Sequence, residues 1–200
     1  MIKLPKIREL GEAMKAIMFG PFTSNFPAVM PKVPDGFRGK PQFYEKDCVG
    51  CRACAEVCPA RAIEVIDEKD KKLRTLIHHQ DICIYCQQCE RACITGKGII
   101  LTKEFDLATF DRKGSTTSAR KELVICGNCG EVVAPLDHIK FLAKKVGTLL
   151  YANPTLLLAR SAELNSLTNE HPTDSEHARS GHLKFLCPNC RREIILKEQW

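Results

Sequence analysis

The sequence has few aromatic residues and no long apolar run. Phe, Trp and Tyr together make up 6% of its 200 residues, so we do not expect a large apolar core. No stretch of about 20 apolar residues occurs, and any membrane association is therefore expected to be peripheral. A dinucleotide-binding glycine pattern and a nucleophile beside a base are also missing. The sequence thus offers no candidate for bond-making chemistry of its own.

Cysteine, in contrast, is abundant, and eight of the 12 cysteines form two copies of one pattern. Both copies have the spacing C-x2-C-x2-C-x3-C, and the second lies 35 residues after the first. The copies are Cys48, Cys51, Cys54, Cys58 and Cys83, Cys86, Cys89, Cys93. This spacing is typical of chains that hold cubane iron-sulfur clusters. It predicts two 4Fe-4S clusters and a role in electron transfer.

The short C-x2-C-x2-C loop wraps three corners of a cube and cannot reach the fourth, so the fourth cysteine of each run is expected to bind the other cluster. A zinc site needs four ligands and does not require the third closely spaced cysteine of each C-x2-C-x2-C loop. This spacing therefore argues against zinc sites or disulfides in the two runs. Pro59 follows Cys58 as the motif expects, whereas Ile94 stands where a second proline is expected. The predicted ligands are Cys48, Cys51, Cys54 and Cys93 for cluster one, and Cys83, Cys86, Cys89 and Cys58 for cluster two.

The remaining four cysteines form two C-x-x-C pairs near the C-terminal end, Cys126 with Cys129 and Cys187 with Cys190. Two such pairs supply four sulfurs to one tetrahedral ion, and loop-closure entropy grows only slowly with the length between them. Tight turns are expected at both pairs. Zinc is the first choice, and a single rubredoxin-like iron or disulfides are the alternatives.

The fold class expected is α+β, with four segments. Residues 1–42 form an amphipathic helix over residues 3–19 and a proline-rich docking arm. Residues 43–110 form a ferredoxin-like two-cluster domain, residues 111–121 a polar linker, and residues 122–200 a zinc-ribbon or rubredoxin-like metal domain with a helical insertion. The apolar stripe of the helix needs a partner, which is another subunit, the membrane interface or the chain's own core.

Each cysteine run is expected to have a strand before it, a short helix around its fourth cysteine and a strand after it. The expected strands span residues 42–45, 63–66, 74–78 and 99–102. The helical insertion is expected near residues 136–149 and 154–167. His78 and His79 are interpreted as surface or packing residues rather than ligands.

Thiolate ligands need a reducing compartment, and the chain opens on charged rather than apolar residues, without the pattern of a signal peptide. We therefore expect the cytoplasmic face of a membrane, with the chain as a peripheral subunit. The formal net charge of +6 is modest, so no nucleic-acid partner is expected.

The twin runs, preceded by a helix, an arm and the element Phe37-Arg38-Gly39, resemble the chain-I-type ferredoxin subunit of complex I and of group 4 membrane-bound NiFe hydrogenases. The C-terminal cysteine pairs resemble the formate hydrogenlyase branch. The resemblance implies an electron-relay subunit without its own small-molecule substrate. Its implied partners are cluster-bearing and NiFe-type catalytic subunits, near a membrane arm.

Two other functions remain open. A soluble two-cluster ferredoxin with an extra zinc or iron site would be a freely diffusing monomer. A nucleic-acid binder would use residues 122–200 as a zinc ribbon, but the cysteine pairs lack interleaved aromatics and a dense basic stripe.

Overall fold

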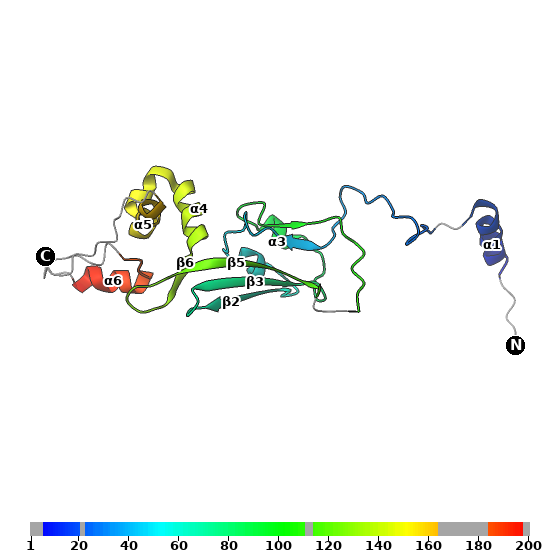
Figure 1. Cartoon of the computed structure of the whole chain (residues 1–200). Helices are drawn as coiled ribbons and strands as arrows, with labels where there is room; N and C mark the ends of the chain where they lie inside the picture. Colours follow the sequence, from blue (N-terminus) through cyan, green and yellow to red (C-terminus); the bar gives the residue numbers. More distant parts are fainter. Residues whose placement is uncertain (1–5, 21–22, 111–113, 164–183, 198–200) are drawn as a thin grey trace. The chain divides into compact units, whose positions relative to one another are not determined.

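The structure is a computed structural model that describes residues 6–20, 23–110, 114–163 and 184–197. The chain divides into two compact units, Met1–Phe37 and Arg38–Trp200, and Figure 1 labels several of their helices and strands. Among the helices described in these ranges, none has both the length and the hydropathy needed to cross a bilayer.

The first unit contains helix α1, Ile7–Phe19. The helix begins with a capping box, in which the carboxylate of Glu9 accepts a hydrogen bond from the Lys6 N–H at 2.9 Å. It ends at Phe19, and the next residue, Gly20, has a φ of 78°, which glycine adopts readily. No residue of α1 is buried in the described structure, and its apolar stripe is exposed. The predicted amphipathic helix is confirmed from residue 7 onward, and residues 3–5 lie outside the described part.

Residues 23–37 form turns and bends without helix or strand, as the density of prolines predicts. The second unit begins after this arm. Strand β1, Pro41–Phe43, pairs antiparallel with β4, Ile99–Leu101. Strand β2, Ile63–Glu68, forms a hairpin with β3, Leu73–His79. All four predicted strands are confirmed, with ends that differ by up to two residues.

The two short helices differ from the prediction by their place in the cysteine runs. Helix α2, Ala53–Glu56, and helix α3, Gln88–Arg91, contain the third cysteine of each run and end before the fourth. Arg52 and Gln87 precede them with φ of 61° and 69°. In each run, this residue with a positive φ turns the chain directly after the second cysteine. The short helix therefore lies around the third cysteine, whereas it was expected around the fourth.

Strand β5, Thr116–Ile125, is the main departure from the prediction. Residues 116–121 were expected to be linker, but residues 116–122 pair with the whole length of β3, and β6, Val132–Pro135, pairs with the end of β5. The sheet order is β2-β3-β5-β6. Alternate β5 side chains point inward, but two of them, Thr117 and Lys121, are polar. These polar residues concealed the alternation typical of a strand.

The C-terminal part is helical, as expected for the insertion. Helix α4, Leu136–Val146, continues into the 3-10 helix η2, Gly147–Ala152, and is followed by α5, Pro154–Glu163. Residues 164–167 of the second predicted helix lie outside the described residues. A small core of Val124, Ile139 and Ala159 joins β5, α4 and α5.

Helix α6, Pro188–Lys197, begins inside the second cysteine pair, where a tight turn was expected. Proline suits the first position of a helix, because the N–H that it lacks has no partner within the helix at that position.

Candidate metal centres

The two cysteine loops repeat one backbone conformation. Gly50 and Arg52 in the first loop have φ of 71° and 61°, and Tyr85 and Gln87, 35 residues later, have φ of 53° and 69°. Left-handed residues between ordinary ones turn successive N–H groups toward the inside of a loop. The Tyr85 N–H, for example, contacts the sulfur of Cys83 at 3.4 Å. Both loops are therefore shaped to present amides to sulfur.

An apolar hollow lies beside the first loop, with walls that include Phe43, Leu76 and Ile99. Four cysteines line it: Cys48, Cys51, Cys54 and Cys93. Cys93 belongs to the second run, so the hollow gathers three cysteines of one run and the fourth of the other. A Cβ on Gly98 would lie 3.0 Å from the Cys48 Cα and 3.2 Å from the Cys93 sulfur. The glycine thus leaves room where the two runs meet.

The other four cysteines also lie near one another. The charge of Cys58 acts to raise the pKa values of Cys83 and Cys89, which shows that these three side chains are close. Cys86 interacts with the same two residues. Between the two groups, Cys54 interacts with Cys89. The structure thus brings together each set of residues that the sequence predicts, and the two sets are neighbours.

The buried cysteines of the two runs have raised pKa values. Burial raises the pKa of Cys54 to about 12 and that of Cys89 to about 11, and neighbouring cysteines add to both shifts. Thiolates in such surroundings need a cationic centre to stabilise them. Eight soft sulfur donors in two sets of four match the ligands of cubane iron-sulfur clusters. The residues present therefore fit the predicted clusters.

Thr95 stabilises the turn after Cys93, where Ile94 occupies the position at which the motif expects a proline. Its hydroxyl lies 3.3 Å from the Cys93 sulfur and accepts a hydrogen bond from the Gly98 N–H at 3.0 Å. Burial acts to raise the pKa of Cys93, but the Thr95 hydroxyl and nearby backbone N–H groups outweigh it, and the pKa is lowered. The turn after Cys93 is thus held by a side chain that the sequence analysis did not single out.

Arg74 is a second residue that the sequence analysis missed. It is 6% exposed and donates from Nη1 to the carbonyl oxygen of Gly50 at 2.9 Å. Its inward position in β3 brings a cation under the first cysteine loop. A charged residue within an alternating strand was the only sequence signal for this contact.

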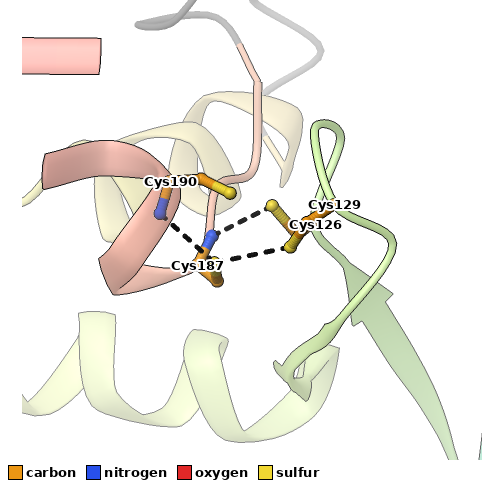
Figure 2. A group of neighbouring side chains, drawn as sticks. All are labelled: Cys126, Cys129, Cys187 and Cys190. Atoms are coloured by element: carbon orange, nitrogen blue, oxygen red, sulfur yellow. Dashed lines mark hydrogen bonds between the residues drawn. The ribbon is translucent and has the colours of Figure 1, made fainter. Parts of the chain in front are cut away.

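The C-terminal cysteines form a tighter group. Figure 2 shows one pair on the turn after β5 and the other at the start of α6. The sulfurs of Cys126, Cys129, Cys187 and Cys190 all lie within 4.8 Å of one another. The sulfurs of Cys129 and Cys187 are 3.6 Å apart. The sequence prediction of one four-sulfur site is matched by this geometry.

Hydrogen bonds to sulfur surround this group. The Cys187 N–H lies 3.3 Å from the Cys126 sulfur, and the Asn128 side-chain amide donates to the Cys190 sulfur at 3.2 Å. Burial acts to raise the pKa of Cys126, but backbone N–H groups, that of Cys129 foremost, lower it to about 6. Amides thus favour the thiolate form of Cys126. At Cys129 the Glu131 N–H acts in the same direction, but the neighbouring cysteine side chains outweigh it and raise the pKa of Cys129 to about 12. A cationic ligand is therefore needed to hold all four sulfurs as thiolates.

Comparison with known proteins gives relatives for the cluster region. A 4Fe-4S dicluster domain family matches residues 47–97. Formate hydrogenlyase subunit 6 of Escherichia coli (strain K12) is 33% identical over 128 residues, which are 64% of this chain and 70% of that subunit. NADH-quinone oxidoreductase subunit I 2 of Solibacter usitatus (strain Ellin6076) is 34% identical over 107 residues, which are 46% of this chain and 68% of that subunit.

Among solved structures, a chain of the membrane-bound sulfane sulfur reductase, an archaeal respiratory membrane complex, is 25% identical. The match covers 57% of this chain and 62% of that chain, and its TM-score of 0.41 is too low to compare the folds. The two sequence relatives are 33% and 34% identical to this chain, and the matches span 70% and 68% of their own length. The chain therefore belongs to the family of 4Fe-4S electron-transfer subunits that includes formate hydrogenlyase subunit 6 and NADH-quinone oxidoreductase subunit I.

Proposed function

We propose that this chain relays single electrons through two 4Fe-4S clusters inside a membrane-bound energy-converting hydrogenase or a complex-I-like oxidoreductase. Its family membership and its two neighbouring sets of four sulfurs support this function. When bound, each cluster accepts and releases one electron. The chain's own residues would hold the two clusters side by side, with the cysteine ligands buried or half-buried.

The proposed ligand sets are crossed. Cluster one binds to Cys48, Cys51, Cys54 and Cys93, and cluster two binds to Cys83, Cys86, Cys89 and Cys58. The observation that carries this assignment is the hollow where Cys93 joins the three cysteines of the first run. The crossing also ties the two cysteine runs together, because neither cluster is complete without both.

Two reciprocal variants test the crossing. Cys93→Ala should remove the electron paramagnetic resonance signal of cluster one, which Cys51→Ala also removes, and about half of the cluster iron. Cys58→Ala should remove the other signal, together with Cys86→Ala. If Cys93→Ala and Cys86→Ala abolish the same signal, the uncrossed assignment is correct and ours is wrong.

For the C-terminal cysteines we propose one tetrahedral ion, with zinc preferred and iron as the alternative. A zinc–sulfur bond of about 2.3 Å places tetrahedral sulfurs about 3.8 Å apart. The sulfur separation of 3.6 Å between Cys129 and Cys187 supports a single ion. Elemental analysis of the anaerobically purified chain separates the outcomes: one zinc, one extra iron, or four extra irons from a third cluster.

We further propose that the chain is a peripheral subunit on the cytoplasmic face of the membrane. Its partners would be a cluster-bearing subunit and an NiFe-type catalytic subunit, without nucleic acid. The exposed apolar stripe of α1 supports docking on another subunit, since such a stripe is stabilised by a partner. Purification of the native chain under mild conditions should recover these subunits. A monomer free of large subunits would instead identify a soluble ferredoxin.

A further inference from the structure

Lys121 of β5 lies against the first cysteine loop. Its Cβ and Cγ are each 3.1 Å from the position that a Cβ on Gly50 would occupy. The residue is 8% exposed, which is unusual for lysine. The contact depends on Gly50 having no side chain. At the equivalent position of the second loop the chain has Tyr85.

The positive charge of Lys121 acts on Cys48, a predicted ligand of cluster one. Its electrostatic interaction with Cys48 works to lower the pKa of that thiol, against the larger opposing effect of burial. Lys121 therefore stabilises negative charge at Cys48. The other buried cation near this loop, Arg74, has its charge balanced by both carboxylate oxygens of Asp67.

Lys121 has its own carboxylate partner in the C-terminal helices. Its Nζ donates to Oδ2 of Asp137, in the first turn of α4, at 2.8 Å. The side chain of Lys121 is 9% exposed and that of Asp137 is 46% exposed. Water therefore screens the carboxylate more than the ammonium group. The ion pair therefore leaves a net positive electrostatic potential at the first cysteine loop.

We propose that Lys121 raises the reduction potential of cluster one, and that Asp137 offsets part of this effect. The proposal rests on the ligand set proposed above for cluster one. Reduction by dithionite in a titration would add one electron to the iron of the cluster, so that the cluster with its four thiolate ligands becomes more negative by one charge. A buried cation beside Cys48 stabilises this reduced state more than the oxidised state. Through Asp137, the position of α4 then influences cluster one but leaves cluster two unchanged.

The test is a redox titration of the full, cluster-loaded chain, followed by electron paramagnetic resonance. Lys121→Met should shift the reduction equilibrium of cluster one toward the oxidised state by about tenfold, which is 59 mV for one electron. The signal of cluster two should not shift, and Lys121→Arg should restore most of the potential. Asp137→Asn should shift cluster one in the opposite direction, by less. The matched control is Lys69→Met, because Lys69 also forms a 2.8 Å ion pair, with Glu131, but is 51% exposed.

The outcomes are separable. An unchanged cluster-one potential in Lys121→Met, with full iron content and both signals, would overturn the inference and leave the proposed function intact. If Lys121→Met does not fold, an unchanged potential in Asp137→Asn would overturn it equally. Equal shifts of both clusters in Lys121→Met would also contradict it. A native chain without two cluster signals would instead refute the proposed function itself.

Discussion

Arg74 binds both carboxylate oxygens of Asp67, with Nε 2.6 Å from Oδ1 and Nη2 2.7 Å from Oδ2. The two residues are direct partners in the β2–β3 hairpin. The pair holds the guanidinium group so that its remaining nitrogen reaches the carbonyl oxygen of Gly50. The conformation of the first cysteine loop thus depends on a hairpin outside the loop.

Asp67→Asn should therefore destabilise the chain. It leaves the buried guanidinium group of Arg74 without its counter-ion, and we expect a loss of about 2 kcal/mol in the free energy of unfolding. Anaerobic denaturation, followed by circular dichroism, measures the loss. Glu68→Gln removes the exposed ion pair with Lys71 and should change little. Equal effects of the two variants would contradict the role of the buried pair.

Gly39→Ala should disrupt the start of the second unit, just before strand β1. The Gly39 N–H donates to the carbonyl oxygen of Thr102 at 3.0 Å, and a Cβ would overlap the carbonyl oxygens of Thr102 and Glu104. We expect a cost of about 1–3 kcal/mol, measured by chemical denaturation. Gly36→Ala is the control, since nothing lies within 4 Å of its added Cβ. A Gly39→Ala chain as stable as the Gly36→Ala chain would show that the strand pairing tolerates the methyl group.

Asn128→Ala should weaken metal binding at the C-terminal cysteines without abolishing it. The variant removes the side-chain hydrogen bond to the Cys190 sulfur, and such partners typically contribute about tenfold or more in affinity. Competition with a chelator measures the change. Cys190→Ser is the reference for complete loss, and both variants should keep the two cluster signals. Chelator resistance equal to that of the natural chain would exclude a role for Asn128.

Stability should fall below pH 6.5 because of His78. Burial, with smaller effects of the charges on His79 and Lys40, lowers the pKa of His78 to about 4. Its ring nitrogens have no hydrogen-bond partner among the described residues. The unfolded chain binds a proton below pH 6.5, whereas the folded chain does so only near pH 4. Stability is thus complete above pH 6.5 and is lost toward pH 4.

This effect predicts a free energy of unfolding about 2 kcal/mol lower at pH 5 than at pH 7. Denaturation at both pH values measures the difference. His78→Leu should remove most of it, because leucine has no titratable group. His79→Gln should keep it, since His79 is only half-buried. A pH dependence that survives in His78→Leu would assign the effect to another group.

The sequence predicted the elements that have a strong local pattern. Cysteine spacing predicted which cysteines lie together in the two runs and in the four-sulfur group, and alternation predicted strands β1 to β4. His78 was correctly interpreted as a packing or surface residue, and it is buried. These features depend on residues that are close in the chain or repeated in it.

The features that were missed depend on contacts between distant residues. Strand β5 was hidden because its inward positions include Lys121, whose burial requires Asp137 and Gly50 to meet it from other elements. From the sequence alone, Arg74 is expected on the surface. It is buried because Asp67 of β2 and Gly50 of the first cysteine loop contact it. Inward-facing charges were therefore the least predictable part of the fold, and both lie against the first cysteine loop.

The pairing of β5 with β3 has a consequence for dividing this protein. A chain shortened at residue 110 would keep every predicted cluster ligand but would expose β3 as an edge strand. The unpaired N–H and C=O groups along Leu73–His79 would then be available to strands of other copies. We therefore expect the isolated two-cluster segment to aggregate, even though its cysteine pattern alone resembles that of an independent domain.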